Sequence, residues 1–298
     1  MQALPLVSIV INCYNGEEFL KNAIDSIYAQ SYQHWEIIFW DNASTDQSPN
    51  IALSYDEKLR YFKSETTTPL YEARSLAVKK AKGDFVGFLD CDDWWSPNKL
   101  EKQMPLFDDL NIGFVYGNYW MENETKRTRK IVSQKLQSSG IILDDLLKHY
   151  TVGILTLIIR RSAYDQLDYG FDKRFNIIGD FDLVIRLAAE WKSDYVDKPI
   201  AHYRSHSNNL STNNPTSSFE ELEEWYKTIL KHSIISKSKA LYNIPIIINY
   251  VRAMFYMKNN KKIDGFNLLL KIPLFRKEKI KATFAFILPK FLLNFLTQ

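Results

Sequence analysis

The sequence predicts an α/β protein with a mostly parallel, Rossmann-like central sheet flanked by helices, followed by a helical C-terminal appendage. Short apolar runs typical of buried strands alternate with segments whose apolar residues recur at helical spacing. Polar residues follow the ends of three of these runs, as at the ligand-binding edge of a parallel sheet. The charge of the chain also changes sign towards its C-terminus, which indicates two parts with different partners.

The composition is that of a folded globular protein. The chain has 298 residues, of which 46% are hydrophobic and 14% aromatic, enough for a sizeable core. Only two cysteines are present, Cys13 and Cys91, so we expect a reducing compartment and no disulfide framework. The first residues lack a basic stretch before an apolar one, so we expect no signal peptide and a cytoplasmic protein.

The first half of the chain supplies the alternating elements. We expect buried strands at 7–11, 35–40 and 84–89, and helices at 17–29 and 70–81. A capping-box pattern at 44–47 predicts a further short helix directly after it. The strands end in Asn12, in Asp41 and in Asp90, which a parallel sheet would bring to one edge.

The second half is expected to complete the sheet and then leave it. Segments 113–116 and 155–159 read as strands, 127–139 as a loop or exposed hairpin, and 181–191 as a helix. The Asn-, Ser- and Thr-rich stretch 208–218 predicts a domain boundary. We therefore expect a catalytic domain over 1–215 and a basic, amphipathic helical region over 216–298.

Three aspartates, Asp90, Asp92 and Asp93, crowd into four residues after the 84–89 strand. Carboxylates at the end of a core strand repel one another and lose hydration, so something must offset the cost. A divalent cation such as Mg²⁺ or Mn²⁺ with an anionic ligand is the simplest compensation. The alternative is a strand-ending turn whose acids cap the next helix.

The C-terminal region is strongly basic. From residue 225 onwards there are 14 Lys and Arg against two acids, whereas the preceding residues carry a net charge of −9. No apolar run reaches the roughly 18–20 residues that span a bilayer. Residues 280–296 suit an amphipathic segment at an anionic membrane surface, or equally a helix packed on the body or on a second subunit.

Six motifs in order resemble those of the family-2 glycosyltransferases, which have the GT-A fold. The resemblance covers about residues 5–210. The motifs are Val7-Ser-Ile-Val-Ile-Asn-Cys-Tyr-Asn15, Asp41-Asn-Ala-Ser-Thr-Asp46 (commonly Asp-Asp-Gly-Ser-Thr-Asp), Ala73-Arg74, Asp90-Cys-Asp92 with the helix after it, Gly179-Asp-Phe-Asp-Leu183, and Tyr203-Arg-Ser-His206.

The resemblance implies an inverting enzyme that moves a sugar from a nucleotide donor, expected to be a UDP-sugar, to an acceptor hydroxyl. A divalent metal, Mn²⁺ or Mg²⁺, would stabilise the diphosphate leaving group. Asp92 is expected to coordinate it most directly, and His206 is a further candidate ligand whose alternative is an ordinary surface histidine. Asp90 is expected to lie near the same cation, or instead to bind the donor nucleotide through its ribose.

The remaining donor residues follow from the same motifs. Asp41 would accept the base N–H of a uracil-type nucleotide, and Asn12 and Tyr14 would line that pocket, Tyr14 as a stacking face or else as core packing. Arg74 would pair with the diphosphate or form an internal salt bridge with Asp90. Both cysteines are expected to be small core residues rather than redox groups.

The acceptor side centres on Asp180, which the resemblance implies as general base. Its structural alternative is the N-cap of the 181–191 helix. Asp182 is assigned to acceptor binding or helix support, and Asp93 to orienting Asp92 or to capping the next helix. Two departures from the family pattern stand nearby: Gly179 replaces the usual Glu before the base, and Pro69 with Leu70 replaces a Gly near the arginine helix.

The sequence thus favours a glycosyltransferase acting on a glycan or lipid-linked acceptor, with peripheral membrane contact through the C-terminal region. A degenerate transferase that only binds carbohydrate or nucleotide-sugar stays open because of Gly179. A nucleotidyltransferase is less favoured, because the turn after the first strand is acidic and not glycine-rich and basic. Nucleic-acid binding is disfavoured by the acidic body.

Overall fold

The computed structural model describes residues 4–124, 126–206, 209 and 216–273, and it separates into two compact units. Unit 1 comprises Met1–Leu146 and Tyr150–Ser207, and unit 2 comprises Leu147–His149 and Asn208–Gln298. The boundary expected after residue 215 stays a prediction, since residues 210–215 lie outside the described ones.

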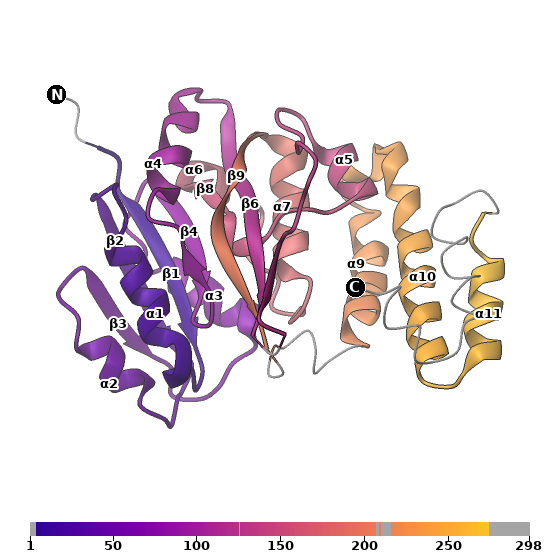
Figure 1. Cartoon of the computed structure of the whole chain (residues 1–298). Coiled ribbons are helices and arrows are strands. Elements are labelled where there is room, and N and C mark those ends of the chain that lie inside the picture. The colour runs from indigo at the N-terminus through magenta and orange to yellow at the C-terminus, as the bar shows by residue number, and fades with distance from the viewer. Residues whose placement is uncertain (1–3, 125, 207–208, 210–215, 274–298) are drawn as a thin grey trace. The chain divides into compact units, whose positions relative to one another are not determined.

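Unit 1 is built on one nine-stranded sheet (Figure 1). Its order is β3-β2-β1-β4-β8-β6-β9-β5, with β7 paired to β6. Strands β3, β2, β1 and β4 run parallel, β8 is antiparallel to both of its neighbours, and β6 and β9 are parallel to each other. The strands are β1 Val7–Cys13, β2 Trp35–Asp41, β3 Leu59–Lys63, β4 Phe85–Asp90, β5 Trp94–Trp95, β6 Ile112–Asn123, β7 Thr128–Ile131, β8 Ile158–Arg160 and β9 Lys192–Ser205.

Helices flank the sheet, and the longest of them, α1 and α7, bury mostly apolar residues. The α-helices of this region are α1 Glu17–Tyr28, α2 Ser48–Leu53, α3 Leu70–Val78, α4 Lys99–Gln103, α5 Leu143–Lys148, α6 Arg161–Asp165 and α7 Gly179–Glu190. In α1 the buried residues Leu20, Ala23, Ile24 and Ile27 share one core with Val7, Ile9, Ile11 and Cys13 of β1. Because side chains alternate along a strand, Ser8, Val10 and Asn12 point to the opposite face.

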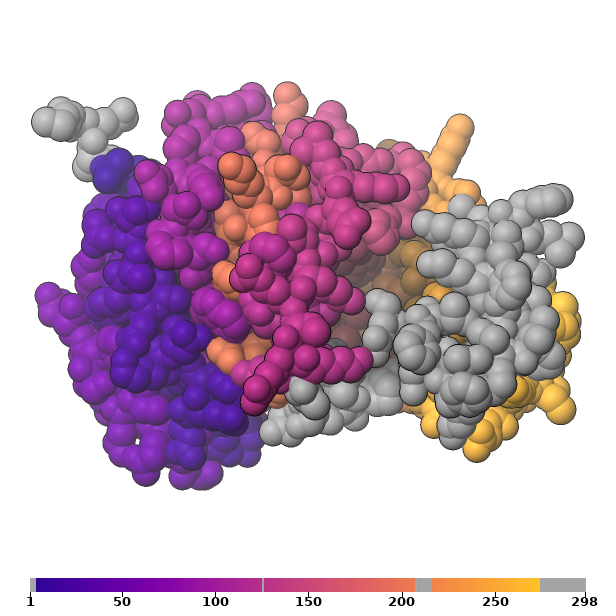
Figure 2. Space-filling model, viewed as in Figure 1, coloured from indigo at the N-terminus to yellow at the C-terminus, as the bar shows by residue number. Residues whose placement is uncertain are grey.

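The expected elements are found, with two differences, and the hairpin alternative for 127–139 is confirmed at 128–131. The 155–159 segment is a 3₁₀ turn, Ile154–Thr156, and only then strand β8. Helix α2 follows the 44–47 pattern but has Gln47 as N-cap and no side-chain cap hydrogen bond, so the capping box is wrong. Residues 128–131 form the exposed hairpin strand β7 against β6, in the magenta part of the surface in Figure 2.

Unit 2 is helical over its described residues, with α9 Ser217–Ile229, α10 Asn243–Lys258 and α11 Lys262–Leu270. Ile246, Ala253 and Met257 of α10 share a core with Leu269 of α11. A Cβ at Gly265 would lie 2.9 Å from the Ala253 carbonyl oxygen, so the close approach of these two helices requires glycine there.

The membrane predictions fall partly outside this structure. Among the residues that it describes, none of the helices has the length and apolarity to cross a bilayer. The amphipathic segment expected at 280–296 lies beyond residue 273 and hence outside the described residues.

Candidate active site

The polar ends of β1, β2 and β4 lie side by side, as expected. Asn12 is the register partner of Asp90 on one side, and Cys13 is the partner of Asp41 on the other. The strand pleat directs Asn12 away from the α1 core, whereas Asp41 lies on the core side, where it contacts Tyr61. Asn12 and Asp41 therefore share an edge of the sheet but point to opposite faces of it.

Asn12 carries an unsatisfied amide. Its side chain is 7% exposed, and neither Oδ1 nor Nδ2 has a hydrogen-bond partner within the described part of the chain. An unpaired buried polar group costs about 1–3 kcal/mol, so this amide is a natural contact for a bound molecule. Tyr14, in the turn after β1, is 54% exposed, which excludes the core-packing alternative and leaves its ring open for stacking.

Asp41 is fully buried and engaged on both oxygens. Oδ1 accepts the backbone N–H of Ser44 at 2.8 Å, and Oδ2 accepts the Tyr61 hydroxyl at 2.6 Å. These contacts hold the 41–46 turn against β3. Within that turn Ala43 has a positive φ of 66°, at the place where the family motif commonly has glycine.

Arg74 forms the internal salt bridge that was one of its two alternatives. Its guanidinium, 2% exposed, donates to Asp90 Oδ1. Burial is the largest single effect and would lower the pKa of Arg74, but Asp90, Tyr71 and Asp180 together raise that pKa. Asp90 is thus neutralised by a permanent cation that reaches it from α3.

Asp92 and His206 meet at the other side of the turn that carries Asp90, Asp92 and Asp93, called the acidic loop below. Nε2 of His206 lies 3.0 Å from Asp92 Oδ2. Burial, reinforced by the charge of Asp90, raises the pKa of Asp92, and the hydrogen bond with His206 opposes that rise. The two residues predicted as metal ligands are therefore brought together, although 114 positions separate them.

Asp93 is buried behind this pair. Its Oδ1 accepts the backbone N–H of Arg204 at 2.8 Å, and burial with the neighbouring charges of Asp92 and Asp90 raises its pKa well above the usual value. The next helix, α4, begins at Lys99 with Asn98 as N-cap. The helix-capping interpretation of Asp93 is therefore wrong, and the residue ties the acidic loop to β9.

Arg204 of β9 contacts this loop and was not among the predicted site residues. Its Nε donates to the Asp92 carbonyl at 2.8 Å, and its guanidinium lies over the rings of Phe19 and Trp94 at 4.3 and 4.5 Å. The signal was present, because residues 202, 204 and 206 share one face of an extended segment. Arg204 and His206 hence act on the same loop.

Asp180 stands in the first turn of α7. The helix starts at Gly179 with Ile178 as N-cap, so the N-cap alternative for Asp180 is wrong. Burial raises the pKa of Asp180, while the Arg74 charge and a hydrogen bond from Tyr71 lower it in part. The Tyr71 hydroxyl donates to Asp180 Oδ1 at 3.0 Å. Tyr71 was missed too, although its position three residues before Arg74 puts both on one face of α3.

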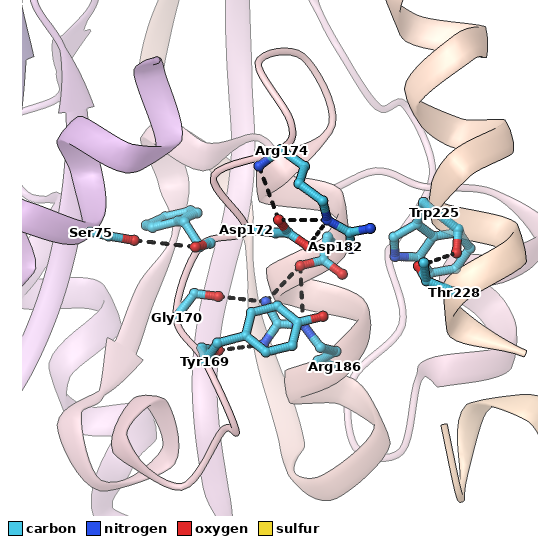
Figure 3. Close-up of polar contacts among 10 residues, drawn as sticks. Ser75, Tyr169, Gly170, Asp172, Arg174, Asp182, Arg186, Trp225 and Thr228 are labelled. Atoms are coloured by element: carbon cyan, nitrogen blue, oxygen red, sulfur yellow. Dashed lines mark hydrogen bonds and ion pairs between the residues drawn. The ribbon is translucent and has the colours of Figure 1, made fainter. Parts of the chain in front are cut away.

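Asp182 supports the helix. Its carboxylate, 1% exposed, pairs with Arg186 at 2.6 Å one turn later. Arg186 also donates to the carbonyls of Tyr169 and Gly170 at 2.7 and 2.6 Å, as Figure 3 shows. Of its two assignments, this geometry matches helix support, because the pair fastens α7 to the 169–174 loop.

The cysteines flank one glycine. Cys13 is buried, Cys91 is half-buried, and a Cβ at Gly16 would lie within 2.9 Å of both sulfurs. Both thiols are free and pack as small residues, as expected. The turn after β1 therefore passes closely over the acidic loop.

A pocket of about 820 Å³ lies elsewhere in unit 1, between α3 and the 169–174 loop. Its lining includes Glu72, Lys79, Arg161 and Tyr169. It contains none of the site residues predicted from sequence, so the chemistry is assigned to the strand ends and not to this hollow.

The side chains at this edge suit a divalent cation that is coordinated partly by the protein and partly by a bound phosphate group. Among the described residues no group of three or more His, Cys, Asp and Glu side chains converges on one point. Mg²⁺, however, is commonly held by one or two carboxylates plus substrate phosphates. Asp92 supplies one such carboxylate, and the imidazole of His206, 3.0 Å from it, is a candidate second protein ligand.

Comparison with known proteins identifies the type of domain. The sequence model of the family described as Glycosyl transferase family 2 matches residues 8–167. The Escherichia coli protein WfgD, a UDP-Glc:alpha-D-GlcNAc-diphosphoundecaprenol beta-1,3-glucosyltransferase, is 34% identical over 167 residues, 56% of this chain and 64% of its own length, which is under two thirds.

Two solved structures share the fold. S. aureus TarS in complex with UDP-GlcNAc has a TM-score of 0.65 at 20% identity, covering 94% of this chain and 80% of its own. The mannosyltransferase PcManGT of Pyrobaculum calidifontis, in complex with GDP-Man and Mn²⁺, has a TM-score of 0.66 at 14% identity, covering 99% and 86%.

Proposed function

We propose that this chain, which belongs to glycosyl transferase family 2, transfers a sugar with inversion from a UDP-sugar to a hydroxyl of a glycan carried on a lipid diphosphate. The resemblance and the GT-A fold predicted from the motifs are both confirmed. The donor and acceptor classes are supported by the name of WfgD, and a UDP-sugar is also the ligand of TarS.

One observation carries the proposal: a single face of α3 serves both halves of the site. Arg74 pairs with Asp90 at the donor edge, and Tyr71 hydrogen-bonds Asp180 at the acceptor edge. The ring of Tyr71 also lies against the Arg74 guanidinium, 4.9 Å from its centroid. A donor bound over the acidic loop would therefore present its sugar towards the base.

On the donor side the chain binds and orients. Asn12 offers its unpaired amide and Tyr14 an exposed ring, whereas Asp41, buried on the opposite face with both oxygens engaged, holds the 41–46 turn. Asp92 and His206 would hold Mn²⁺ or Mg²⁺, which when bound neutralises charge on the departing diphosphate. Arg74 keeps Asp90 fixed and adds a permanent positive charge to the same edge.

On the acceptor side Asp180 would take the proton of the attacking hydroxyl. Burial raises its pKa, which makes its ionised form a better proton acceptor than an ordinary aspartate. A single base without a second nucleophile fits a direct displacement, which inverts the anomeric centre.

The test combines binding and turnover. UDP-, GDP- and dTDP-sugars with and without Mn²⁺ should give a Mn²⁺-dependent rise in melting temperature for UDP-sugars alone. Asp180→Asn should retain that rise and lose turnover by about 10²–10⁴-fold. Donor binding with no turnover by the unaltered protein would instead support the carbohydrate-binding alternative, and no shift with any nucleotide would refute the donor site.

A peripheral membrane position is proposed for unit 2. On α11, Ile263 and Leu270 are 76% and 61% exposed and two turns apart on one face. Exposed Lys261 and Lys271 bracket the helix, and each basic residue near anionic lipid contributes about 1 kcal/mol. An I263S/L270S variant should sediment less with vesicles rich in phosphatidylglycerol, whereas L110S, which removes an exposed leucine of unit 1, should not. Equal sedimentation of all three proteins would exclude this surface.

A further inference from the structure

Gly179 and Tyr71 form a matched pair beside the base. A Cβ added at Gly179 would lie 2.4 Å from both Cγ and Cδ2 of the Tyr71 ring. Real contacts of this kind are longer than 3.0 Å, so no side chain at 179 is compatible with the ring where it stands. The departure from the family pattern at 179 therefore has a physical reason in this chain: the tyrosine ring fills the space.

The ring is held from several sides. Tyr71 is 3% exposed. Phe171 packs against it at 5.3 Å between ring centroids, and Arg74 lies over its face. The position of the hydroxyl is thereby fixed, 3.0 Å from Asp180 Oδ1 and 3.4 Å from the Ile177 carbonyl. Because a hydroxyl has one proton, the shorter contact to the carboxylate takes it.

We propose that Tyr71 is a positioning residue for the base, with Gly179 as the opening that admits it. The hydroxyl engages Oδ1 of Asp180 and turns Oδ2 towards the acceptor. This inference rests on the proposed function. In the step it serves, the acceptor O–H breaks and its proton moves to Oδ2. The oxygen's electron pair forms the bond to the anomeric carbon, and the diphosphate leaves with the electrons of the broken C–O bond.

The groups that face Asp180 determine in which direction its pKa should move when the Tyr71 hydroxyl is removed. From α3 these are Arg74 and Tyr71, and both favour the carboxylate form. Tyr119 of β6 and Tyr150, in the segment before the Ile154–Thr156 turn, also face it. Burial raises the pKa of both tyrosines, and the charge of Asp180 raises it further. Removing only the Tyr71 hydroxyl takes away one stabiliser of the ionised form, so the pKa of Asp180 must rise.

The primary variant is Tyr71→Phe, which keeps the ring. We expect kcat to fall by roughly tenfold, the effect of losing one hydrogen bond to a charged group. The acid limb of the kcat–pH profile should move to higher pH. KM for the donor should stay unchanged, because the lost hydroxyl contacts Asp180 and the ring that packs on Arg74 is kept. The matched control is Tyr55→Phe, which removes a tyrosine–aspartate hydrogen bond of 2.7 Å to Asp25 on α1. It should leave kcat and the profile unaltered.

A second variant reaches the same endpoint by another route. Gly179→Ala forces the Tyr71 ring aside, so its acid limb should shift in the same direction even if the protein is less stable. A purely structural role for the pair would lower the melting temperature of both variants without moving the limb.

The failures are distinguishable. If Asp180→Asn keeps full turnover, the base assignment falls, whatever Tyr71 does. If Asp180→Asn is inactive but the Tyr71→Phe profile superimposes on that of the unaltered enzyme, only the positioning role of Tyr71 is refuted.

Discussion

Replacing Arg204 by methionine should weaken binding of a UDP-sugar with Mn²⁺ by roughly 30-fold. Arg204 does not belong to the predicted donor residues, yet its side chain holds the loop that carries Asp92, the predicted metal ligand. Its Nε donates to the Asp92 carbonyl, one Nη donates to Asn22 at 3.0 Å, and the other pairs with Glu124. Without these contacts, binding of the UDP-sugar would have to order the acidic loop, and the free energy of binding would be smaller by that cost.

The magnitude follows from the contacts. Two hydrogen bonds contribute about 1 kcal/mol each, and the rings of Phe19 and Trp94 add about 0.5–1 kcal/mol each as cation–π partners. Glu124 is 39% exposed, so its pair adds little. The terms overlap and do not sum in full, which leaves about 2 kcal/mol, or roughly 30-fold in Kd. Arg204→Lys should lose about half of this, since it keeps the charge but not the planar fork.

The assay is titration calorimetry with the donor and Mn²⁺, supported by melting temperatures without ligand. Arg252→Met in unit 2 is the matched control, because it also removes an Arg–Glu pair, at 2.6 Å, and a cation–π contact, with Phe219. It should cost stability but leave the affinity unchanged. A folded Arg204→Met protein with native affinity would refute the reasoning.

Three further predictions concern protonation and backbone strain. Turnover should fall on acidification with a midpoint above the usual aspartate value of 3.8, because burial raises the pKa of Asp180 and only its ionised form accepts a proton; a midpoint at 3.8 or below in the kcat–pH profile would contradict this. Lys99 is fully buried, and burial lowers its pKa well below 10.5. Unfolding therefore takes up a proton, so the free energy of unfolding should rise with pH, by up to about 1.4 kcal/mol per pH unit. Urea unfolding from pH 7 to 10 should show that slope, and Lys99→Met should lack it. Ala43→Gly should stabilise by about 1 kcal/mol by relieving the positive φ, whereas Ala52→Gly inside α2 should destabilise in the same thermal melts.

The strands that are buried on both faces of the sheet were predictable from the sequence. The runs at 7–11, 35–40 and 84–89 are apolar throughout, which is typical of central parallel strands. The run at 155–159 is equally apolar but begins as a 3₁₀ turn, because composition alone does not separate a buried turn from a buried strand. Strand β9 was not foreseen: it is polar, contains Pro199, and pairs with β6 through several register shifts.

The candidate site was predictable in its acids and not in their partners. Asp90, Asp92 and Asp180 stand out because acids at the ends of buried segments need compensation. The compensating groups come from far along the chain: Arg74 from α3, and Arg204 with His206 from the end of β9. Such pairing depends on which strands become neighbours, and β5 against β9 is a long-range pairing that no local pattern encodes.

These partners bear on how the charges of the three aspartates in the acidic loop are compensated. The crowding of three aspartates suggested that a cation was the simplest compensation, but each one already has a protein partner: Asp90 has the Arg74 guanidinium, Asp92 has a hydrogen bond with His206, and Asp93 has the backbone N–H and nearby charge of Arg204. We therefore expect that folding of unit 1 does not require a bound ion and that the proposed diphosphate contact does. Chelation with EDTA should leave the melting temperature of the free protein within about a degree and abolish the shift given by a UDP-sugar. Because metal binding adds directly to stability when it occurs in the folded state alone, a large drop in the ligand-free melting temperature would mean that the protein partners do not suffice and that the loop is built around the ion.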